Sequence, residues 1–185
     1  MQKNMNNKEI KLHLGCGEKF IPGFLHLDTR KFSHVDYVTS VDKLDMFRND
    51  SVDLIYACHL LEHFKRNDTE KVLKEWYRVL KPGGILRIAV PDFEKLVEVY
   101  LKYKDLKLIL GPLIGRQDYP ENIHYRIFDF ATLSEILKNV GFKEVYRYDW
   151  RKTIHKDYDD YSQAYIPHMD KEHGILISLN IEAKK

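Results

Sequence analysis

Two short segments of the sequence carry residue types that suit a bound nucleoside. Gly15 and Gly17 form a Gly-x-Gly pattern after an apolar run at 10–14, and Asp28 follows the next run, 24–27. Glycines at the end of a strand let the backbone turn sharply and approach a ligand without a Cβ clash. A carboxylate at the end of the neighbouring strand can accept hydrogen bonds from both hydroxyl groups of an adenosine ribose. Together the two segments predict a nucleoside pocket.

The spacing of these residues distinguishes a dinucleotide pocket from a pocket for a ligand without a pyrophosphate. Gly15 and Asp28 lie thirteen positions apart, whereas the dinucleotide pattern needs about twenty and a third glycine at the start of a helix. Pro22 and Gly23 interrupt the connection, so a full crossover helix does not fit there. We therefore expect a ligand with adenosine but without a pyrophosphate. An NAD oxidoreductase is the disfavoured alternative.

A third pattern is typical of a metal site. His59, Glu62 and His63 match the H-x-x-E-H motif of zinc proteases, in which a helix brings both imidazoles to one face. Here the motif directly follows a run at 52–57 that predicts a buried strand. We interpret the motif as the loop entering the next helix and predict no bound metal.

His124 is the candidate catalytic residue, as a general base. It lies in a segment, 106–129, without clear periodicity, and long irregular segments in compact domains often carry function. A histidine titrates near neutral pH, so it can take a proton from a hydroxyl or an amine. We predict that His124 contributes to the acceptor site. Two alternatives stay open: His124 only anchors its loop, or His59 or His63 supplies the base.

The elements that must position these residues form an α/β pattern. Short apolar runs alternate with helical stripes, which is typical of a mainly parallel sheet. The expected strands span 10–14, 24–27, 35–39, 52–57, 85–90, 144–148 and 175–183. Gly17, Asp28 and His59 each come just after one of these strands, so we expect them at the carboxyl ends.

The first expected helix has an apolar stripe on one face. Asn67 and Glu70 offer a capping pair ahead of it, and the Pro-Gly-Gly segment at 82–84 is expected to end it. The stripe consists of Val72, Leu73, Trp76, Val79 and Leu80. We expect Trp76 to be a core residue rather than a stacking platform.

Two further helices are expected. One spans 93–103 and is expected to turn inward the side chains of Phe93, Leu96, Val97 and Tyr100. The other begins at a capping box, Thr132 with Glu135, and ends at Gly141, where a left-handed residue belongs. Phe142 is then expected to fold back on Leu137.

In their order along the chain, these motifs resemble a class I S-adenosylmethionine-dependent methyltransferase of the type-11 kind. The resemblance covers residues 10–100 and 128–148. Its most specific part is the Arg-Val-Leu-Lys-Pro-Gly-Gly segment at 78–84, where a helix runs into a strand. The family implies a Rossmann-like sandwich whose mainly parallel sheet has an antiparallel last strand. It also implies S-adenosylmethionine as methyl donor and S-adenosylhomocysteine as product.

The resemblance assigns roles residue by residue. The two glycines would line the methionine part of the cofactor, and Asp28 would hold the ribose hydroxyls. Val41 and Asp42 would sit at the adenine, and Cys58 and His59 would lie beside the sulfonium. The full cofactor-binding set that it implies is Gly15, Cys16, Gly17, Asp28, Val41, Asp42, Cys58 and His59. The first crossover is shorter than in many family members.

Composition limits the partners. The 185 residues carry 30 Lys plus Arg against 28 Asp plus Glu, a net charge of +2, without the basic excess of a nucleic-acid or membrane-surface binder. The longest apolar stretch, 108–115, is far shorter than a membrane span. Residues 1–9 lack the apolar core of a signal peptide, so we expect a flexible leader on a cytoplasmic protein. Residues 10–185 are expected to form one domain, and its oligomeric state stays open, homodimer included.

The acceptor is expected to be a small polar metabolite. The segments 106–129 and 149–173 are neutral to acidic, which argues against a nucleic-acid funnel. The alternatives are a peptide or protein methyltransferase and a non-catalytic S-adenosylmethionine-binding module. Segment 149–173, with Trp150 and three tyrosines, is expected to be an insertion that covers the acceptor pocket. A packing flap or a dimer contact is the alternative for this segment.

Overall fold

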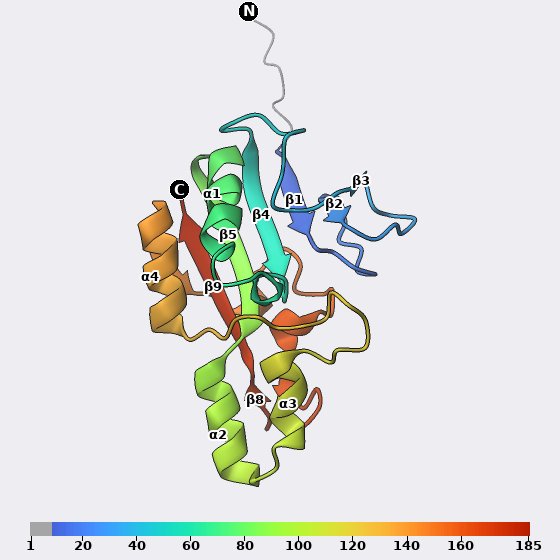
Figure 1. The fold of residues 1–185 in the computed structure, drawn as a ribbon, viewed down its shortest axis with the longest axis vertical. Coiled ribbons are helices and arrows are strands. Elements are labelled where there is room, and N and C mark those ends of the chain that lie inside the picture. Colours follow the sequence, from blue (N-terminus) through green and yellow to red (C-terminus); the bar gives the residue numbers. More distant parts are fainter. Residues whose placement is uncertain (1–8) are drawn as a thin grey trace, which may run out of the picture.

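The computed structural model describes residues 9–185, so the expected leader lies outside the described residues except for Glu9. The main sheet contains β1 (Lys11–Leu14), β2 (Leu25–Asp28), β3 (Tyr37–Val38), β4 (Val52–Cys58), β5 (Leu80–Pro91), β6 (Lys143–Arg147) and β9 (Ser178–Lys184). Their order is β3-β2-β1-β4-β5-β9-β6 (Figure 1). β9 runs antiparallel to both of its neighbours, and the other pairs are parallel. The predicted mainly parallel sheet with an antiparallel last strand is confirmed.

The helices are α1 (Thr69–Val79), α2 (Phe93–Tyr103), α3 (Lys107–Ile114) and α4 (Phe130–Val140). α1 and α4 cover one face of the sheet, whereas α2 and α3 lie beyond the carboxyl ends of β4 and β5 (Figure 1). Three single turns of 3₁₀ helix are η1 (Leu61–His63), η2 (Trp150–Lys152) and η3 (Tyr161–Gln163). A separate pair of short strands joins β7 (Tyr165–Ile166) to β8 (Ile175–Leu176).

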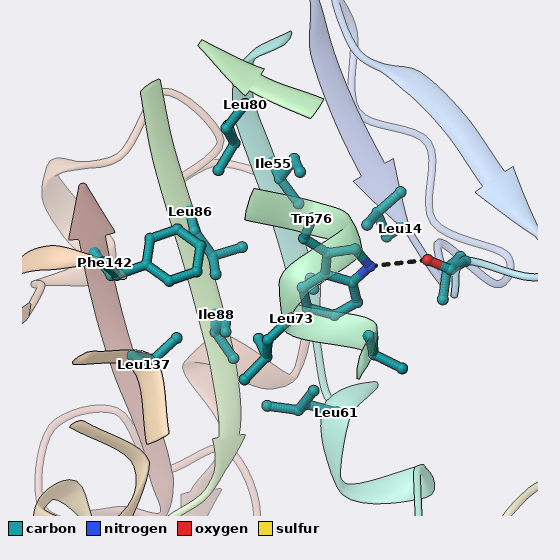
Figure 2. Packing of buried hydrophobic residues seen from close by; sticks show 14 of the residues in the cluster. Leu14, Ile55, Leu61, Leu73, Trp76, Leu80, Leu86, Ile88, Leu137 and Phe142 are labelled. Carbon is teal, nitrogen blue, oxygen red and sulfur yellow. Dashed lines mark hydrogen bonds between the residues drawn. The ribbon is translucent and has the colours of Figure 1, made fainter. Parts of the chain in front are cut away.

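The face under α1 and α4 holds the apolar core. Successive strand residues point to opposite sides of a sheet, so alternate residues of β1, β4, β5 and β9 enter this core. Trp76 of α1 is fully buried there, and its indole N–H donates to the carbonyl oxygen of Val41 at 2.9 Å (Figure 2). The predicted core role of Trp76 is confirmed.

The opposite face is polar and aromatic, and irregular chain covers it. The buried polar side chains of its strands include His13, His26, Arg87, Asn180 and Glu182. Segment 149–173 packs here: the ring centroid of His155 lies 4.0 Å from that of Tyr56, and the Tyr56 hydroxyl donates to Asp160. The segment thus replaces a helical layer on this face. Its expected role over the acceptor pocket stays a prediction.

The boundaries of α1 differ from those expected. Asp68, not Asn67, is the N-cap, and its side chain makes no capping hydrogen bond. The helix ends at Val79, before the Pro-Gly-Gly segment, because Leu80 already pairs with Val52 in the sheet. Pairing with β4 therefore ends the helix earlier than the local turn residues would.

The predicted bounds of α2 are confirmed, but of its four predicted inward residues only Leu96 is buried. Leu96 and Val99 are its buried residues, whereas Phe93, Val97 and Tyr100 remain 40%, 38% and 41% exposed. The helix extends past the sheet and packs on α3 and β8 through a narrower stripe. α3 itself was not predicted, because Gly111 and Pro112 lie within it and suggested an irregular segment.

The capping box predicted for α4 is also wrong, since Asp129 is the N-cap and accepts from the Thr132 backbone N–H at 2.7 Å. The predicted end is confirmed. Gly141 has a φ of +121°, and the Phe142 N–H donates back to the Leu137 carbonyl at 3.0 Å. The expected last strand, 175–183, divides into β8 and β9.

Candidate functional site

The glycine turn and Asp28 meet at the carboxyl ends of β1 and β2. The Gly17 backbone N–H donates to Asp28 Oδ2 at 2.7 Å, and the Gly15 N–H donates to the Leu27 carbonyl at 2.8 Å. Gly15 has a φ of +61°, and a Cβ there would lie 2.6 Å from a methyl carbon of Leu60. A side chain at this position would therefore clash. None of the described residues between β1 and β2 is helical, as the short spacing predicted.

Asp28 is buried, yet its carboxylate keeps hydrogen-bonding capacity. The Arg30 backbone N–H donates to Oδ1 at 2.8 Å, so each oxygen accepts one backbone N–H. Oδ1 also lies 3.5 Å from the Nε–H donor of Arg30. Because a carboxylate oxygen has two lone pairs, one remains on Oδ2 for a ribose hydroxyl, and the second on Oδ1 is shared with Arg30. The Arg30 guanidinium lies beside Gly17 and 5.1 Å from the ring centroid of Tyr119. A ligand on the glycine turn must therefore contact or displace Arg30.

The two residues expected at the adenine differ in exposure. Val41 is buried in the same apolar cluster as Leu14 and Leu27, the residues that lead into the glycine turn and Asp28. Asp42 is exposed and accepts a hydrogen bond from the Ser40 hydroxyl. Val41 thus lies in the core that supports the expected pocket, whereas Asp42 lies at the surface.

Cys58 and His59 lie together at the carboxyl end of β4. The His59 backbone N–H donates to the Ala89 carbonyl of β5 at 2.8 Å. Burial raises the pKa of the Cys16 thiol to about 12 and also raises that of Cys58, so both thiols stay protonated at neutral pH. Both cysteines are free. These properties favour a packing role for the two cysteines over redox chemistry.

A second polar constellation surrounds Glu62, which lies in η1 and is fully buried. His59 Nδ1 lies 3.3 Å from Glu62 Oε1, and His124 Nε2 lies 4.0 Å from the same oxygen. The ring centroids of His63 and His124 are 4.8 Å apart. The chain thus brings His124 from a distant loop to the segment after β4.

Backbone carbonyls orient two of these imidazoles. His63 Nδ1 lies 3.1 Å from the Ile123 carbonyl oxygen, and His124 Nδ1 lies 2.9 Å from that of Pro112. A carbonyl oxygen only accepts, so each Nδ1 carries the hydrogen and each Nε2 keeps its lone pair. The tautomers follow from these hydrogen-bond partners.

Burial leaves this constellation uncharged at neutral pH. Desolvation raises the pKa of Glu62 to about 8 and lowers the pKa of His59 to about 3. It also lowers the pKa of His124 to about 4, and the pKa of His63 falls for the same reason. All three imidazoles are therefore free of the second proton at pH 7.

The zinc-protease geometry that the motif suggested does not form. Only 61–63 make a single 3₁₀ turn, and His59 lies outside it with a φ of +48°. The two imidazoles of the motif therefore do not share one face of a regular helix. Glu62 is part of the H-x-x-E-H motif, whose interpretation as a zinc site was rejected, and its burial beside His124 was not predicted. Nothing in the sequence marked Arg30 except its place two residues after Asp28.

Two surface cavities, of about 270 and 340 Å³, are not lined by Gly17, Asp28, Glu62 or His124. The first is lined by residues 19–21 and 157–160, and the second lies between α2 and β8. The candidate site therefore rests on residue geometry and not on the size of a hollow. None of the helices in residues 9–185 has the length and apolar character needed to cross a membrane.

Sequence comparisons identify similar proteins. Residues 20–88 match a family model described as a methyltransferase domain, a match that begins after the glycine turn. The demethylmenaquinone methyltransferase of Chlorobaculum tepidum is 26% identical over 138 residues, 69% of this chain and 55% of that protein. The ubiquinone/menaquinone biosynthesis C-methyltransferase UbiE of Pseudoalteromonas translucida is 29% identical over 120 residues, 60% of this chain and 47% of that protein. The chain spans about half the length of the curated relatives it matches.

Solved structures show the same fold. An S-adenosylmethionine-dependent methyltransferase from Archaeoglobus fulgidus aligns over 96% of this chain and 86% of its own, with a TM-score of 0.59 and 15% identity. The 1,6-didemethyltoxoflavin-N1-methyltransferase of Burkholderia thailandensis aligns over 95% of this chain and 70% of its own, with a TM-score of 0.58 and 14% identity. The chain has the class I methyltransferase fold, and the resemblance inferred from its motifs is confirmed.

Proposed function

We propose that this chain is an S-adenosylmethionine-dependent methyltransferase that acts on a small polar acceptor. The observation that carries the proposal is the hydrogen bond from the Gly17 N–H to the Asp28 carboxylate, which joins the two expected cofactor segments. In this proposal the glycine turn holds the methionine part and Asp28 holds the ribose. Cys58 and His59 lie beside the sulfonium. The remaining members of the proposed cofactor site are Gly15, Cys16, Val41 and Asp42.

The proposed reaction is an in-line displacement. The methyl carbon leaves the sulfonium sulfur, which keeps the bonding electron pair, as a bond forms to an acceptor oxygen, nitrogen or carbon. The protein mainly supplies alignment. A hydroxyl or amine acceptor must also lose a proton, and His124 is the proposed base. Because its pKa is about 4, His124 is available but weak, so a hydroxyl acceptor needs further activation.

The surroundings of Glu62 favour a polar acceptor, since apolar acceptors do not satisfy buried polar groups. The curated relatives are named as a demethylmenaquinone methyltransferase and a ubiquinone/menaquinone biosynthesis C-methyltransferase, which makes demethylmenaquinone the second candidate acceptor. A peptide acceptor, a non-catalytic cofactor-binding module and an NAD oxidoreductase remain the alternatives.

A thermal-shift panel with S-adenosylhomocysteine present separates these hypotheses. It would contain sugars, amines, demethylmenaquinone, a peptide mixture and NAD, and each hit would be tested for transfer of a labelled methyl group. We expect S-adenosylhomocysteine to raise the melting temperature and a polar compound to become labelled. Stabilisation by NAD alone would favour the oxidoreductase. Binding of S-adenosylhomocysteine without any labelled compound would favour the binding module.

We also propose that the insertion at 149–173 reaches the acceptor side through Tyr161. The Tyr161 ring centroid lies 5.4 Å from that of His59, and its side chain is exposed. Tyr161→Ala is expected to raise KM for the acceptor with the melting temperature unchanged, because the rest of the insertion still covers the sheet. An unchanged KM would leave the insertion as a structural cover.

A further inference from the structure

We propose that Glu62, His63 and His124 bind one divalent transition-metal ion next to the methyl-donor site. One ligand-type atom of each residue lies within 4.8 Å of the others. In a tetrahedral site, two atoms bound to one ion at about 2.0–2.2 Å lie about 3.3–3.6 Å apart. A pair of ligand atoms at the 4.8 Å limit therefore has to close by about 1.2–1.5 Å when an ion binds, a shift that side-chain rotation can supply.

The strongest observation is the carboxylate of Glu62. Its side chain is fully buried, and neither oxygen has a hydrogen-bond partner among residues 9–185. The 3.3 Å approach of His59 Nδ1 does not have hydrogen-bond alignment. Buried carboxylates are normally satisfied by donors or by a cation. An ion between Glu62 and the two histidines supplies the partner that the protein does not.

The histidines are prepared for this role. The Nδ1–H groups of His63 and His124 donate to the carbonyls of Ile123 and Pro112. Metal-bound histidines commonly donate their other ring N–H to such an acceptor, which fixes the ring and its tautomer. In both residues this leaves Nε2 as the free ligand atom.

The loop that carries His124 is fixed against the other ligands. The Tyr125 N–H donates to the Glu62 carbonyl at 2.9 Å, and the His124 N–H donates to the Ile114 carbonyl at 3.2 Å. Backbone bonds on both sides of the ligand therefore set its distance from Glu62. Such a framework reduces the reorganisation needed to bind an ion.

The donor set indicates the class of metal. Two imidazole nitrogens and one carboxylate oxygen suit Zn²⁺, Co²⁺ or Fe²⁺, whereas Ca²⁺ and Mg²⁺ prefer oxygen ligands. Three protein ligands leave open positions. This set differs from the zinc-protease pattern, which pairs His59 with His63 and does not include His124. The sequence led us to predict no bound metal, and this proposal departs from that prediction, which stays untested.

Its consequence for the acceptor rests on the proposed function. Leu60 lies against Gly15, so the segment with Glu62 and His63 adjoins the glycine turn. An ion there would bind an acceptor hydroxyl and lower its pKa, with the proton passing to water. His124 would then hold the ion and would not act as the general base. The oxygen then forms its bond to the methyl carbon as the carbon–sulfur bond breaks. The acceptor class is therefore a compound with a metal-binding hydroxyl group.

Metal uptake tests the proposal without an acceptor. Chelator-treated protein would be equilibrated with Zn²⁺ or Co²⁺ and dialysed, then examined by elemental analysis, visible absorption of bound Co²⁺ and thermal unfolding. We expect one equivalent of metal and a higher melting temperature. Glu62→Gln, which keeps the side-chain shape, and His124→Ala are each expected to weaken binding at least ~10-fold. His173→Ala, at an exposed histidine, is the matched control and is expected to bind normally.

Two results would overturn the proposal: wild-type protein that retains less than about a tenth of an equivalent, or variants that retain as much metal as wild type. The wild-type measurement decides even where a variant fails to fold. Calorimetry with S-adenosylhomocysteine separates the metal site from the proposed function. Loss of metal with cofactor affinity within about threefold supports the metal site, whereas absent cofactor binding in metal-loaded wild type counts only against the proposed function.

Discussion

The two faces of the central sheet are covered by different kinds of chain, helices on one face and an irregular segment on the other. On one face, α1 and α4 bury an apolar core around Trp76 and Leu73. On the other, segment 149–173 buries histidines, a tyrosine and an Arg87–Glu182 ion pair with a 2.6 Å contact. The strands alternate between these chemistries residue by residue. The packing of the helices on the sheet is therefore stabilised mainly by the total apolar area that it buries. The packing of the irregular segment is stabilised mainly by specific polar pairs.

The largest expected effect tests the helical face. Trp76→Ala removes a fully buried indole and its hydrogen bond to Val41, so we expect a loss of about 3–5 kcal/mol in the free energy of unfolding. Denaturant unfolding measures it. The control is Trp150→Ala, at a partly exposed tryptophan of the other face. Equal losses for the two variants would contradict the contrast drawn between the faces.

Acidification is expected to destabilise the polar face first. Burial lowers the pKa of His13 and of His155 from 6.5 to about 3. Below pH 6.5 the unfolded chain therefore binds protons that the folded chain does not. The contribution of each histidine to the free energy of unfolding is fully present above pH 6.5. It decreases as the pH drops towards 3, by up to about 1.4 kcal/mol per pH unit for each histidine.

Unfolding free energies measured between pH 7 and 4 check this. His155→Gln is expected to give a shallower fall than wild type, while His173→Gln, at an exposed position, leaves the slope unchanged. A wild-type slope that His155→Gln does not alter would show that the buried histidine is not the source of the acid sensitivity.

A smaller effect is expected from one hydroxyl of the polar face. Tyr56→Phe removes the buried donor to Asp160 and is expected to cost about 1–2 kcal/mol. Tyr146→Phe removes a hydroxyl that donates to Glu182 from an exposed side chain, so we expect less than about 0.5 kcal/mol. Chemical denaturation of both variants measures the difference, and a reversed order would refute the role given to burial.

The features of the fold that could be predicted from the sequence are those that depend on local patterns, and the features that were missed depend on tertiary contacts. The stripe of α1, the end of α4 at Gly141 and the positions of the strands along the chain rest on periodicity and turn chemistry, which are local. The inner face of α2 was misassigned because its apolar residues outnumber those that find a partner. Phe93 stays exposed since the helix extends beyond the sheet. Periodicity shows which residues are able to be buried, and tertiary contacts decide which are.

The candidate site divides in the same way. Gly17 and Asp28 were predicted together because adjacent parallel strands bring their ends to one edge. The approach of His124 to Glu62 was not predicted, since it joins residues about sixty positions apart through an irregular loop. The motif that contains Glu62 suggested a helix with His59 and His63 on one face. A 3₁₀ turn forms instead, and His63 lies next to His124. Local patterns thus identified the proposed cofactor side, and only the fold identified the polar constellation.

Calorimetry of S-adenosylhomocysteine binding tests the central claim most directly. Wild type would be compared with Asp28→Ala, which removes the proposed ribose ligand, and with Asp45→Ala, at an exposed aspartate outside the site. We expect binding by wild type and the control, and an affinity roughly 10–100-fold lower in Asp28→Ala, from about 1–3 kcal/mol of lost hydrogen bonding. Undiminished affinity in Asp28→Ala, or no binding by wild type, would contradict the proposed function.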